Sequence, residues 1–348
     1  MKKKYLPLVL IIHIACCTFL FAAPVEIIQG SLKLVMYPDK GNFSLYQLSD
    51  IGKNRYEPLF EDRNSSLTSW FSVQSNGRVF KLEKKAGKPV LFEQTPTGGK
   101  YTFTLTDDFQ VVQEFAFLNS ATTQSAIGVR IDSTIENTSG KDGSFSLKAV
   151  FDTNLGETEG IHFFTNLQNR ISSEIKLEKG KDQDLFIVSK NRNLSLMFLL
   201  AGNVATQPEI VYAANWDRLN TLTWKPEYVD GRSFNTLYSV NDSALLFVWP
   251  ETTLAPNNVL SVTMVLGPYT PELVSLSQNT STPSVKVIVK DLPQTVAPVK
   301  SVNQDQNARV TQILARIAEI QADPSLASDT ELDQLNKDLD ILLSQPKE

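Results

Sequence analysis

Three acidic residues in one short loop are the strongest chemical feature of the sequence. Asp152, Glu157 and Glu159 lie in the stretch FDTNLGETEG, where Gly156 and Gly160 let the backbone turn tightly. Carboxylates and loop carbonyls are ligands that Ca²⁺ prefers, so these acids form a candidate calcium site, although their spacing matches no EF-hand. Paired carboxylates about 5–9 Å apart also perform glycoside hydrolysis. The loop therefore predicts a calcium site, sugar chemistry or an ordinary solvated turn.

A second segment concentrates aromatic, arginine and amide side chains. Its candidate ligand-binding residues are Asn215, Trp216, Arg218, Trp224, Tyr228 and Arg232. Flat rings stack on the apolar faces of sugars, and guanidinium groups bind hydroxyls or carboxylates. Large aromatic side chains near strand ends also pack in protein cores. The segment therefore predicts either a platform for a sugar or peptide, or core packing.

Missing residue types exclude several chemistries. Cys16, Cys17 and His13 all lie in an N-terminal apolar segment, so His162 is the only histidine after it and no cysteine remains. This removes disulfides, thiolate metal sites, a cysteine nucleophile and histidine-rich zinc sites. The sequence also contains no GxSxG, Walker A or GxGxxG motif. These absences favour a non-enzymatic protein and predict no cofactor apart from calcium.

The N-terminus has the three parts of a secretory signal peptide. Three lysines at positions 2–4 precede an apolar run over 5–21, and Ala22 and Ala23 follow. We assign residues 1–22 to the signal and expect a periplasmic or secreted protein. An uncleaved membrane anchor, or a lipoprotein acylated at Cys16 or Cys17, is the alternative. No later apolar stretch approaches the length of a membrane span, so none is expected after cleavage.

The charge of the chain argues against polyanionic partners. The formal net charge is −5, and without the three N-terminal lysines 30 basic residues face 38 acidic ones. A mildly acidic chain is a poor ligand for nucleic acid or anionic lipid. We therefore expect neither partner.

Short strands separated by turn residues extend over 25–268. Phe145, Leu147, Ala149 and Phe151 alternate with less apolar residues, and Asn76-Gly77 is the clearest hairpin signal. Further strands include one predicted over 219–224. No helical pattern of 10–15 residues interrupts the series, which excludes repeated βαβ units. The sequence predicts an all-β fold, a large antiparallel two-sheet sandwich over residues 23–270.

The C-terminal part changes its pattern. Residues 271–304 read as a linker with one short strand near 285–289, and apolar residues over 305–348 then follow helical spacing. The second predicted helix carries an a/d stripe of leucines, so a small αα-hairpin is expected. Two short helices cannot bury their apolar faces alone. The hairpin is therefore expected to pack on the sandwich, to self-associate or to bind an envelope protein.

Several segments in order resemble a known type of protein. The acidic loop FDTNLGETEG, the segment ANWDRL, DGRSF and the stretch NDSALLFVWPETTLAPNNVLSVTMVLGPY are similar to secreted bacterial β-sandwich proteins of the galactose-mutarotase-like supersandwich type. The resemblance covers residues 144–269 and implies the fold. Asn257 stands in the turn where Pro-Gly is usual, and asparagine tolerates positive φ. Mutarotase chemistry uses more than a single histidine, so that activity is not implied.

These features favour an exported periplasmic binding or structural protein of the bacterial cell envelope, with residues 305–348 used for assembly or partner docking. The alternative is a carbohydrate-binding or carbohydrate-active protein. That alternative requires the acidic loop and the aromatic segment to line one cleft.

Overall fold

The computed structural model describes residues 23–61, 68–85, 87–88, 90–278 and 286–288. Contacts divide the chain into two units, Met1–Lys290 and Asp291–Glu348. The predicted signal segment 1–22 and the predicted helical hairpin over 305–348 lie outside the described residues. None of the helices in the described part of the chain is long and apolar enough to cross a membrane.

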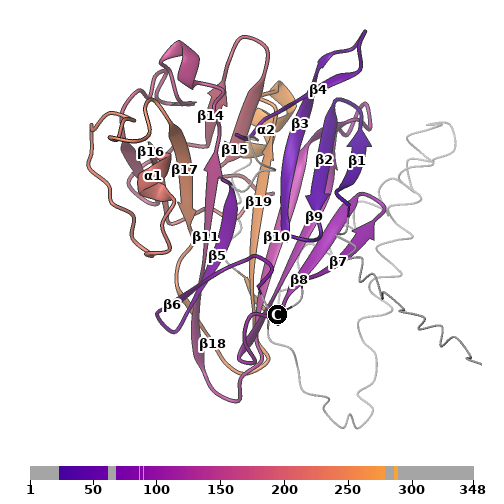
Figure 1. Ribbon diagram of the computed structural model, residues 1–348, viewed down its shortest axis with the longest axis vertical. Helices are drawn as coiled ribbons and strands as arrows, with labels where there is room; N and C mark the ends of the chain where they lie inside the picture. Colours follow the sequence, from indigo (N-terminus) through magenta and orange to yellow (C-terminus); the bar gives the residue numbers. More distant parts are fainter. Residues whose placement is uncertain (1–22, 62–67, 86, 89, 279–285, 289–348) are drawn as a thin grey trace, which may run out of the picture. The chain divides into compact units, whose positions relative to one another are not determined.

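Three antiparallel sheets build the described fold (Figure 1). The first has the order β1 (Val25–Gln29), β2 (Leu32–Tyr37), β3 (Asn42–Asp50), β4 (Arg55–Pro58). The second runs β12 (Phe164–Thr165), β14 (Phe186–Lys190), β15 (Ser195–Leu199), β19 (Val259–Gly267), β10 (Ala126–Asn137), β9 (Phe109–Asn119), β8 (Gly98–Phe103), β7 (Val90–Thr95), with β20 (Lys286–Ile288) beside β19. The third runs β13 (Ile175–Glu178), β16 (Ile210–Asn215), β17 (Ser243–Val248), β11 (Gly143–Asp152), β5 (Trp70–Ser75), β6 (Arg78–Lys81), with β18 (Thr252–Leu254) beside β11.

The two larger sheets pack against each other as predicted, and the four-stranded sheet adds to their core. One hydrophobic cluster contains residues from all three sheets. Phe151 of β11 lies near its centre, with its ring centroid 5.0 Å from that of Phe198 and 5.6 Å from that of Phe71. The antiparallel sandwich predicted from the strand pattern is therefore confirmed, with a third sheet that the pattern did not reveal.

Strand β11 shows how the sequence pattern becomes packing. Its alternate residues Phe145, Leu147, Ala149 and Phe151 belong to the main core. Lys148 and Val150 point to the opposite face, yet both are also fully buried. A second cluster, which includes Trp70, Val150 and Leu246, covers that outer face together with Trp216 and Trp224. The segment after β16 therefore covers the outer face of the seven-stranded sheet.

Local turn chemistry agrees with the sequence at two asparagines. Asn76 and Gly77 both have positive φ, 49° and 78°, at the turn between β5 and β6. Asn257 also has positive φ, 63°, in the turn before β19. Both turns therefore use the left-handed conformation that asparagine and glycine tolerate.

Two segments differ from the sequence prediction. The strand expected over 219–224 is absent; instead, helix α1 (Trp216–Leu219) follows β16 and is capped by the Asn215 side chain. Helix α2 (Pro271–Ser277) occupies the start of the predicted linker, and its Leu273 is fully buried. Proline at the start of α2 and the Thr270 cap favour a helix there. The alternation of apolar residues that was used to predict strands does not detect these two signals.

Candidate functional site

The acidic loop begins where β11 ends and is held by hydrogen bonds to a distant part of the chain. The Asp152 amide donates to Ser69 Oγ at 3.0 Å, and the Asp152 carbonyl accepts from the Glu61 amide at 3.0 Å. Thr153 Oγ1 donates to the Leu59 carbonyl at 2.9 Å. At Gly156 a Cβ would lie 2.4 Å from the carbonyl oxygens of the facing chain, so only glycine fits. These contacts fix where the Asp152 side chain points.

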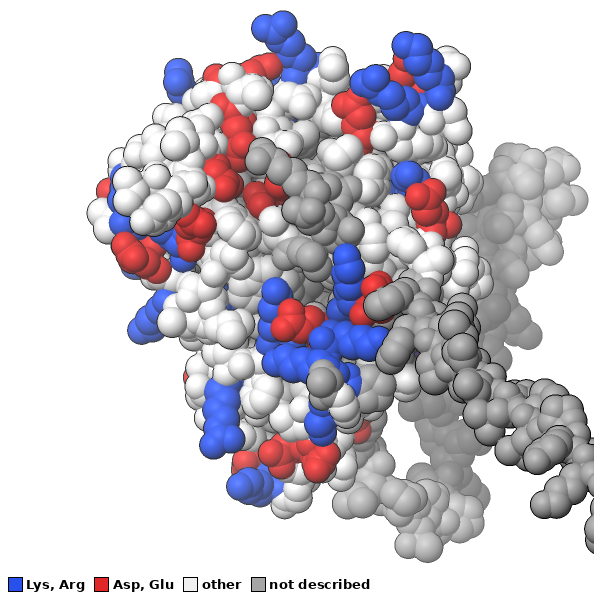
Figure 2. Space-filling model, in the orientation of Figure 1, with Lys and Arg blue, Asp and Glu red and all other residues white. Residues whose placement is uncertain are grey.

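A cavity of about 370 Å³ lies beside this loop, and we call it the acidic cavity. Its lining consists of Glu61, Thr68, Asp152, Glu157, Trp216, Asp217, Tyr238, Ser239, Val240 and Asp242. Figure 2 shows acidic side chains gathered over the region where β11, α1 and β17 lie in Figure 1. The volume falls within the range of small-molecule sites, about 300–1,000 Å³. Five carboxyl groups and no basic side chain line the cavity.

Asp152 is the most perturbed acid of this cavity. Its side chain is nearly inaccessible, with the residue 3% exposed. Burial, followed by the negative charges of Asp242, Glu157 and Glu61, raises the pKa of Asp152 to about 8, against a smaller opposing effect of a hydrogen bond from Thr68. Loss of hydration and like charges both disfavour the ionised form. Asp152 therefore holds a proton at neutral pH and can donate it in a hydrogen bond.

Glu157 and His162 have largely structural contacts around the cavity. Glu157 Oε1 accepts from the Ser243 amide at 3.0 Å, which ties the loop to the start of β17. The His162 ring contacts Asn241 Oδ1 at 3.0 Å and lies against Phe234, with ring centroids 4.2 Å apart. Burial lowers the pKa of His162. The lone histidine is thus a packed neutral side chain outside the lining of the cavity.

Glu159 is separated from the other two acids of the predicted calcium site. It is exposed and pairs with Arg192 at 3.5 Å, whereas Asp152 and Glu157 line the acidic cavity. Within the described residues, no group of three or more His, Cys, Asp or Glu side chains is arranged to hold a metal ion. The structure therefore brings together two of the three predicted ligands.

The aromatic segment contributes one ring to the acidic cavity. Trp216 lines the cavity and donates from Nε1 to the Thr68 carbonyl at 3.1 Å. Asn215 is fully buried and donates from Nδ2 to the Phe234 carbonyl at 2.9 Å, so it positions the segment. Tyr238, which is 90% exposed, stands at the rim of the same cavity. The acidic loop and the start of the aromatic segment do share a cleft.

Both arginines of the segment bind a buried glutamate instead of facing the cavity. Arg218 and Arg232 form ion pairs with the two carboxylate oxygens of Glu174, whose side chain is fully buried. The Val229 amide donates to the same carboxylate at 3.2 Å. A buried carboxylate needs such partners to offset lost hydration. The arginines therefore anchor the loop between α1 and β17.

Trp224 and Tyr228 lie over the outer face of the seven-stranded sheet. Trp224 covers the buried ammonium group of Lys148, 5.5 Å from its ring centroid, and borders another cavity of about 410 Å³. The Tyr228 ring packs against Tyr212 at 5.3 Å, and its hydroxyl donates to Asp230 at 2.7 Å. Burial and the Asp230 carboxylate raise the pKa of Tyr228. Neither side chain lines the acidic cavity.

Seven of the ten lining residues were not singled out from the sequence: Glu61, Thr68, Asp217, Tyr238, Ser239, Val240 and Asp242. Asp242 immediately precedes β17 within the NDSA stretch, so a polar residue at the start of a buried strand was an available signal. Glu61 and Thr68 flank a segment far from the acidic loop in sequence. Only the pairing of β5 with β11 brings them there.

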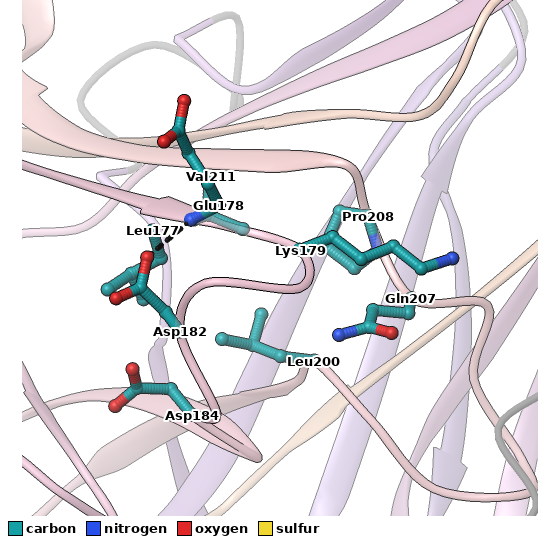
Figure 3. A pocket seen from close by; sticks show the side chains of 9 residues that line it. All are labelled: Leu177, Glu178, Lys179, Asp182, Asp184, Leu200, Gln207, Pro208 and Val211. Carbon is teal, nitrogen blue, oxygen red and sulfur yellow. Dashed lines mark hydrogen bonds between the residues drawn. The ribbon is translucent and has the colours of Figure 1, made fainter.

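A third hollow, lined by Glu178, Asp182 and Asp184 among others, is too small for a ligand (Figure 3). Its volume is about 20 Å³, which accommodates about one water molecule. Asp182 Oδ2 accepts from the Glu178 amide at 2.7 Å, as the dashed line in Figure 3 shows. Asp182 therefore stabilises the turn after β13.

No protein-family model and no curated protein sequence matches the chain. Solved structures of similar fold include a galactose mutarotase-like protein from Lactobacillus casei ATCC 334, with 8% identity and a TM-score of 0.42 over 71% of this chain and 100% of that one. A protein from Synechocystis sp. PCC 6803 has 12% identity and a TM-score of 0.41, over 71% and 96%. A polysaccharide lyase has 10% identity and a TM-score of 0.40. The match covers 69% of this chain and 32% of the lyase.

The TM-scores of these three structures all lie below 0.5. The likeness is distant and concerns the fold. The activities in those names belong to those proteins.

Proposed function

We propose that the protein is an exported glycan-binding protein and that the acidic cavity binds the sugar. The observation that carries the proposal is the meeting of Asp152 and Glu157 with Trp216 in one cavity of about 370 Å³. Sugar-binding sites combine hydroxyl-binding polar groups with rings that pack on the apolar face of the sugar. The signal-like segment 1–22 supports export, and the apolar stripes of residues 305–348 support assembly or partner docking.

The lining assigns different parts of a sugar to different side chains. The carboxyl oxygens of Asp217 and Asp242 can accept hydrogen bonds from hydroxyl or ammonium groups. Protonated Asp152 donates to an oxygen of the ligand. Trp216 and the exposed Tyr238 offer rings. Because no basic side chain lines the cavity, a sugar with an ammonium group should bind better than its neutral counterpart.

Titration calorimetry with two matched ligands tests this proposal. Glucosamine tetramer should bind at least about tenfold more tightly than N-acetylglucosamine tetramer, because only the first carries positive charge. Tyr238→Ala should weaken binding by about tenfold through loss of one stacking ring. Leu237→Ala is the matched control, because Leu237 is 85% exposed and lies next to Tyr238 but does not line the cavity. Equal affinities for both tetramers, or equal effects of both variants, would contradict the proposal.

Glycoside hydrolysis is the second candidate, and the protonated state of Asp152 favours it. A carboxylic acid that keeps its proton near neutral pH can act as the general acid, with a second carboxylate such as Glu157 as its partner. Release of reducing ends from the same tetramers, abolished in Asp152→Asn, would make the protein a hydrolase. Binding without release at pH 5–8 would leave the binding function.

A further inference from the structure

A lysine-rich surface lies beside the N-terminal end of β5. Thr68 lines the acidic cavity, whereas the next residues, Ser69 and Trp70, line a cavity in this lysine-rich surface. We call this surface the lysine face and define it by Lys40, Lys81, Lys84, Lys85 and Lys88. Four of these residues lie in the stretch KLEKKAGK, which begins at Lys81, the last residue of β6, and the fifth belongs to the turn between β2 and β3. The Lys84 amide donates to the Lys40 carbonyl at 3.0 Å, which joins the two segments. Figure 2 shows a concentration of basic side chains in this region.

The lysine face contains a cavity of about 220 Å³. Its lining is Asp39, Lys40, Asn42, Ser69, Trp70, Lys81, Leu82, Glu83 and Lys84. This volume is below the range of about 300–1,000 Å³ for complete small-molecule ligands. Lys85 and Lys88 lie outside the lining and extend the charge beyond the cavity. The arrangement therefore suits one unit of a longer ligand, with its neighbouring units along the surface.

Most of the positive charge is available to a ligand. Lys81 pairs with Glu83 at 3.3 Å and Lys88 with Asp107 at 3.7 Å. Among the described residues, Lys40, Lys84 and Lys85 form no ion pair, and Lys84 and Lys85 are exposed. Local repulsion between these ammonium groups is relieved when an anion binds. The surface is thus basic although the chain as a whole has a net charge of −5.

The uncharged and acidic groups of the lining distinguish between classes of polyanion. Trp70 is only 5% exposed, with Lys81 Nζ 5.2 Å from its ring centroid, so it offers no open platform for nucleic-acid bases. Leu82 is 3% exposed and gives no apolar side chain for insertion into a membrane. Asp39 and Glu83 accept hydrogen bonds from hydroxyl groups but repel a dense row of phosphates. Hydroxyl groups beside well-spaced anions are the chemistry of an acidic polysaccharide.

We propose that the lysine face binds an acidic polysaccharide, with one uronate unit in the cavity and adjacent units along Lys84, Lys85 and Lys88. Lysine ammonium groups bind the sugar carboxylates, while Asp39 and Glu83 accept hydrogen bonds from hydroxyls. This site is independent of the acidic cavity. The net charge of the chain predicts no polyanionic partner, and the proposed site on the lysine face departs from that expectation.

The test compares galacturonan oligosaccharides with their methyl-esterified form, which has the same backbone without its charge. The full chain should bind the acid form, and the double variant Lys84→Gln/Lys85→Gln should bind it about 25-fold more weakly at low salt, or roughly fivefold for each lysine near an anionic surface. Lys53→Gln/Lys181→Gln removes the same charge from exposed lysines elsewhere. This control should bind as the wild type does.

Each alternative result overturns the proposal in a recognisable way. Equal binding by both double variants would show that the lysine face is not the site. Equal binding of the methyl-esterified form would show that the sugar charge is not recognised. Tighter binding of duplex DNA or of phosphatidylglycerol vesicles than of galacturonan would assign the face to a different polyanion. Thermal unfolding of both double variants checks that these exposed substitutions leave the fold intact.

Discussion

Replacing Asp152 with asparagine should stabilise the protein at neutral pH while it removes a proton donor from the acidic cavity. The pKa of Asp152 is about 8 in the folded protein and near 3.8 without these surroundings. Between these values the unfolded chain loses the proton and the folded chain keeps it. The free energy of unfolding of the wild type therefore falls as the pH rises from about 4 to about 8.

The pKa difference sets the size of this effect. One pKa unit corresponds to about 1.36 kcal/mol, so about three units between 3.8 and pH 7 give a ceiling of about 4 kcal/mol. Asparagine has nearly the same shape and never ionises, and the backbone hydrogen bonds of residue 152 to Ser69 and Glu61 remain. We expect Asp152→Asn to gain about 2–4 kcal/mol at pH 7. For a domain of this size that corresponds to a rise in Tm of roughly 5–10 °C.

Thermal unfolding at pH 5, 7 and 8.5 measures the effect. The Tm of the wild type should fall relative to that of Asp152→Asn as the pH increases. Asp217→Asn is the matched control, because Asp217 lines the same cavity but is exposed, and its Tm should follow that of the wild type. A variant whose Tm changes with pH in parallel with the wild type, or falls below it at pH 8.5, would refute the assignment of a protonated Asp152.

Two other buried charges give predictions with opposite signs. Glu174→Gln should lower the free energy of unfolding by about 3–5 kcal/mol in urea titration, because it leaves Arg218 and Arg232 without their carboxylate. Glu227, the exposed partner of Arg232, gives the control: Glu227→Gln should lower the free energy of unfolding by less than about 1 kcal/mol. Lys148→Met should instead gain about 1–2 kcal/mol at pH 7, because burial lowers the pKa of this lysine to about 8 and the folded protein holds its charge at a cost. Loss of the hydrogen bonds from Lys148 Nζ to the carbonyls of Thr221 and Thr223 offsets part of this gain and keeps it small. The wild type, but not Lys148→Met, should regain that stability between pH 8 and 10.5; a loss of stability in this variant would contradict the reasoning.

The fold could be predicted from local patterns because strands and turns leave local signals. The alternation in β11 and the Asn76-Gly77 turn specify antiparallel pairing without knowledge of distant contacts. The strand predicted over 219–224 was wrong, because helix α1 ends at Leu219 and residues 220–224 form no strand. The sequence signal for α1 is its asparagine cap, a single residue at position 215.

The candidate site could be predicted only in part, because its residues meet through long-range pairing. Asp152, Glu157 and Trp216 were recognisable by type. Arg218 and Arg232 were equally recognisable by type, but both form ion pairs with the buried Glu174 and do not line the cavity. Nothing in the local sequence around Glu174 reveals its burial. The register of β11 against β5 and β17 decides which of these side chains share a cavity.

The segment at the start of β5 separates two surfaces of opposite charge. Thr68 lines the acidic cavity, whereas the next residues, Ser69 and Trp70, line the cavity of the lysine face. A ligand with one sign of charge is favoured on one side of this segment and repelled on the other. The two proposed sites therefore discriminate against each other's ligand, and Tyr238→Ala and Lys84→Gln/Lys85→Gln should each impair binding of only one sugar class.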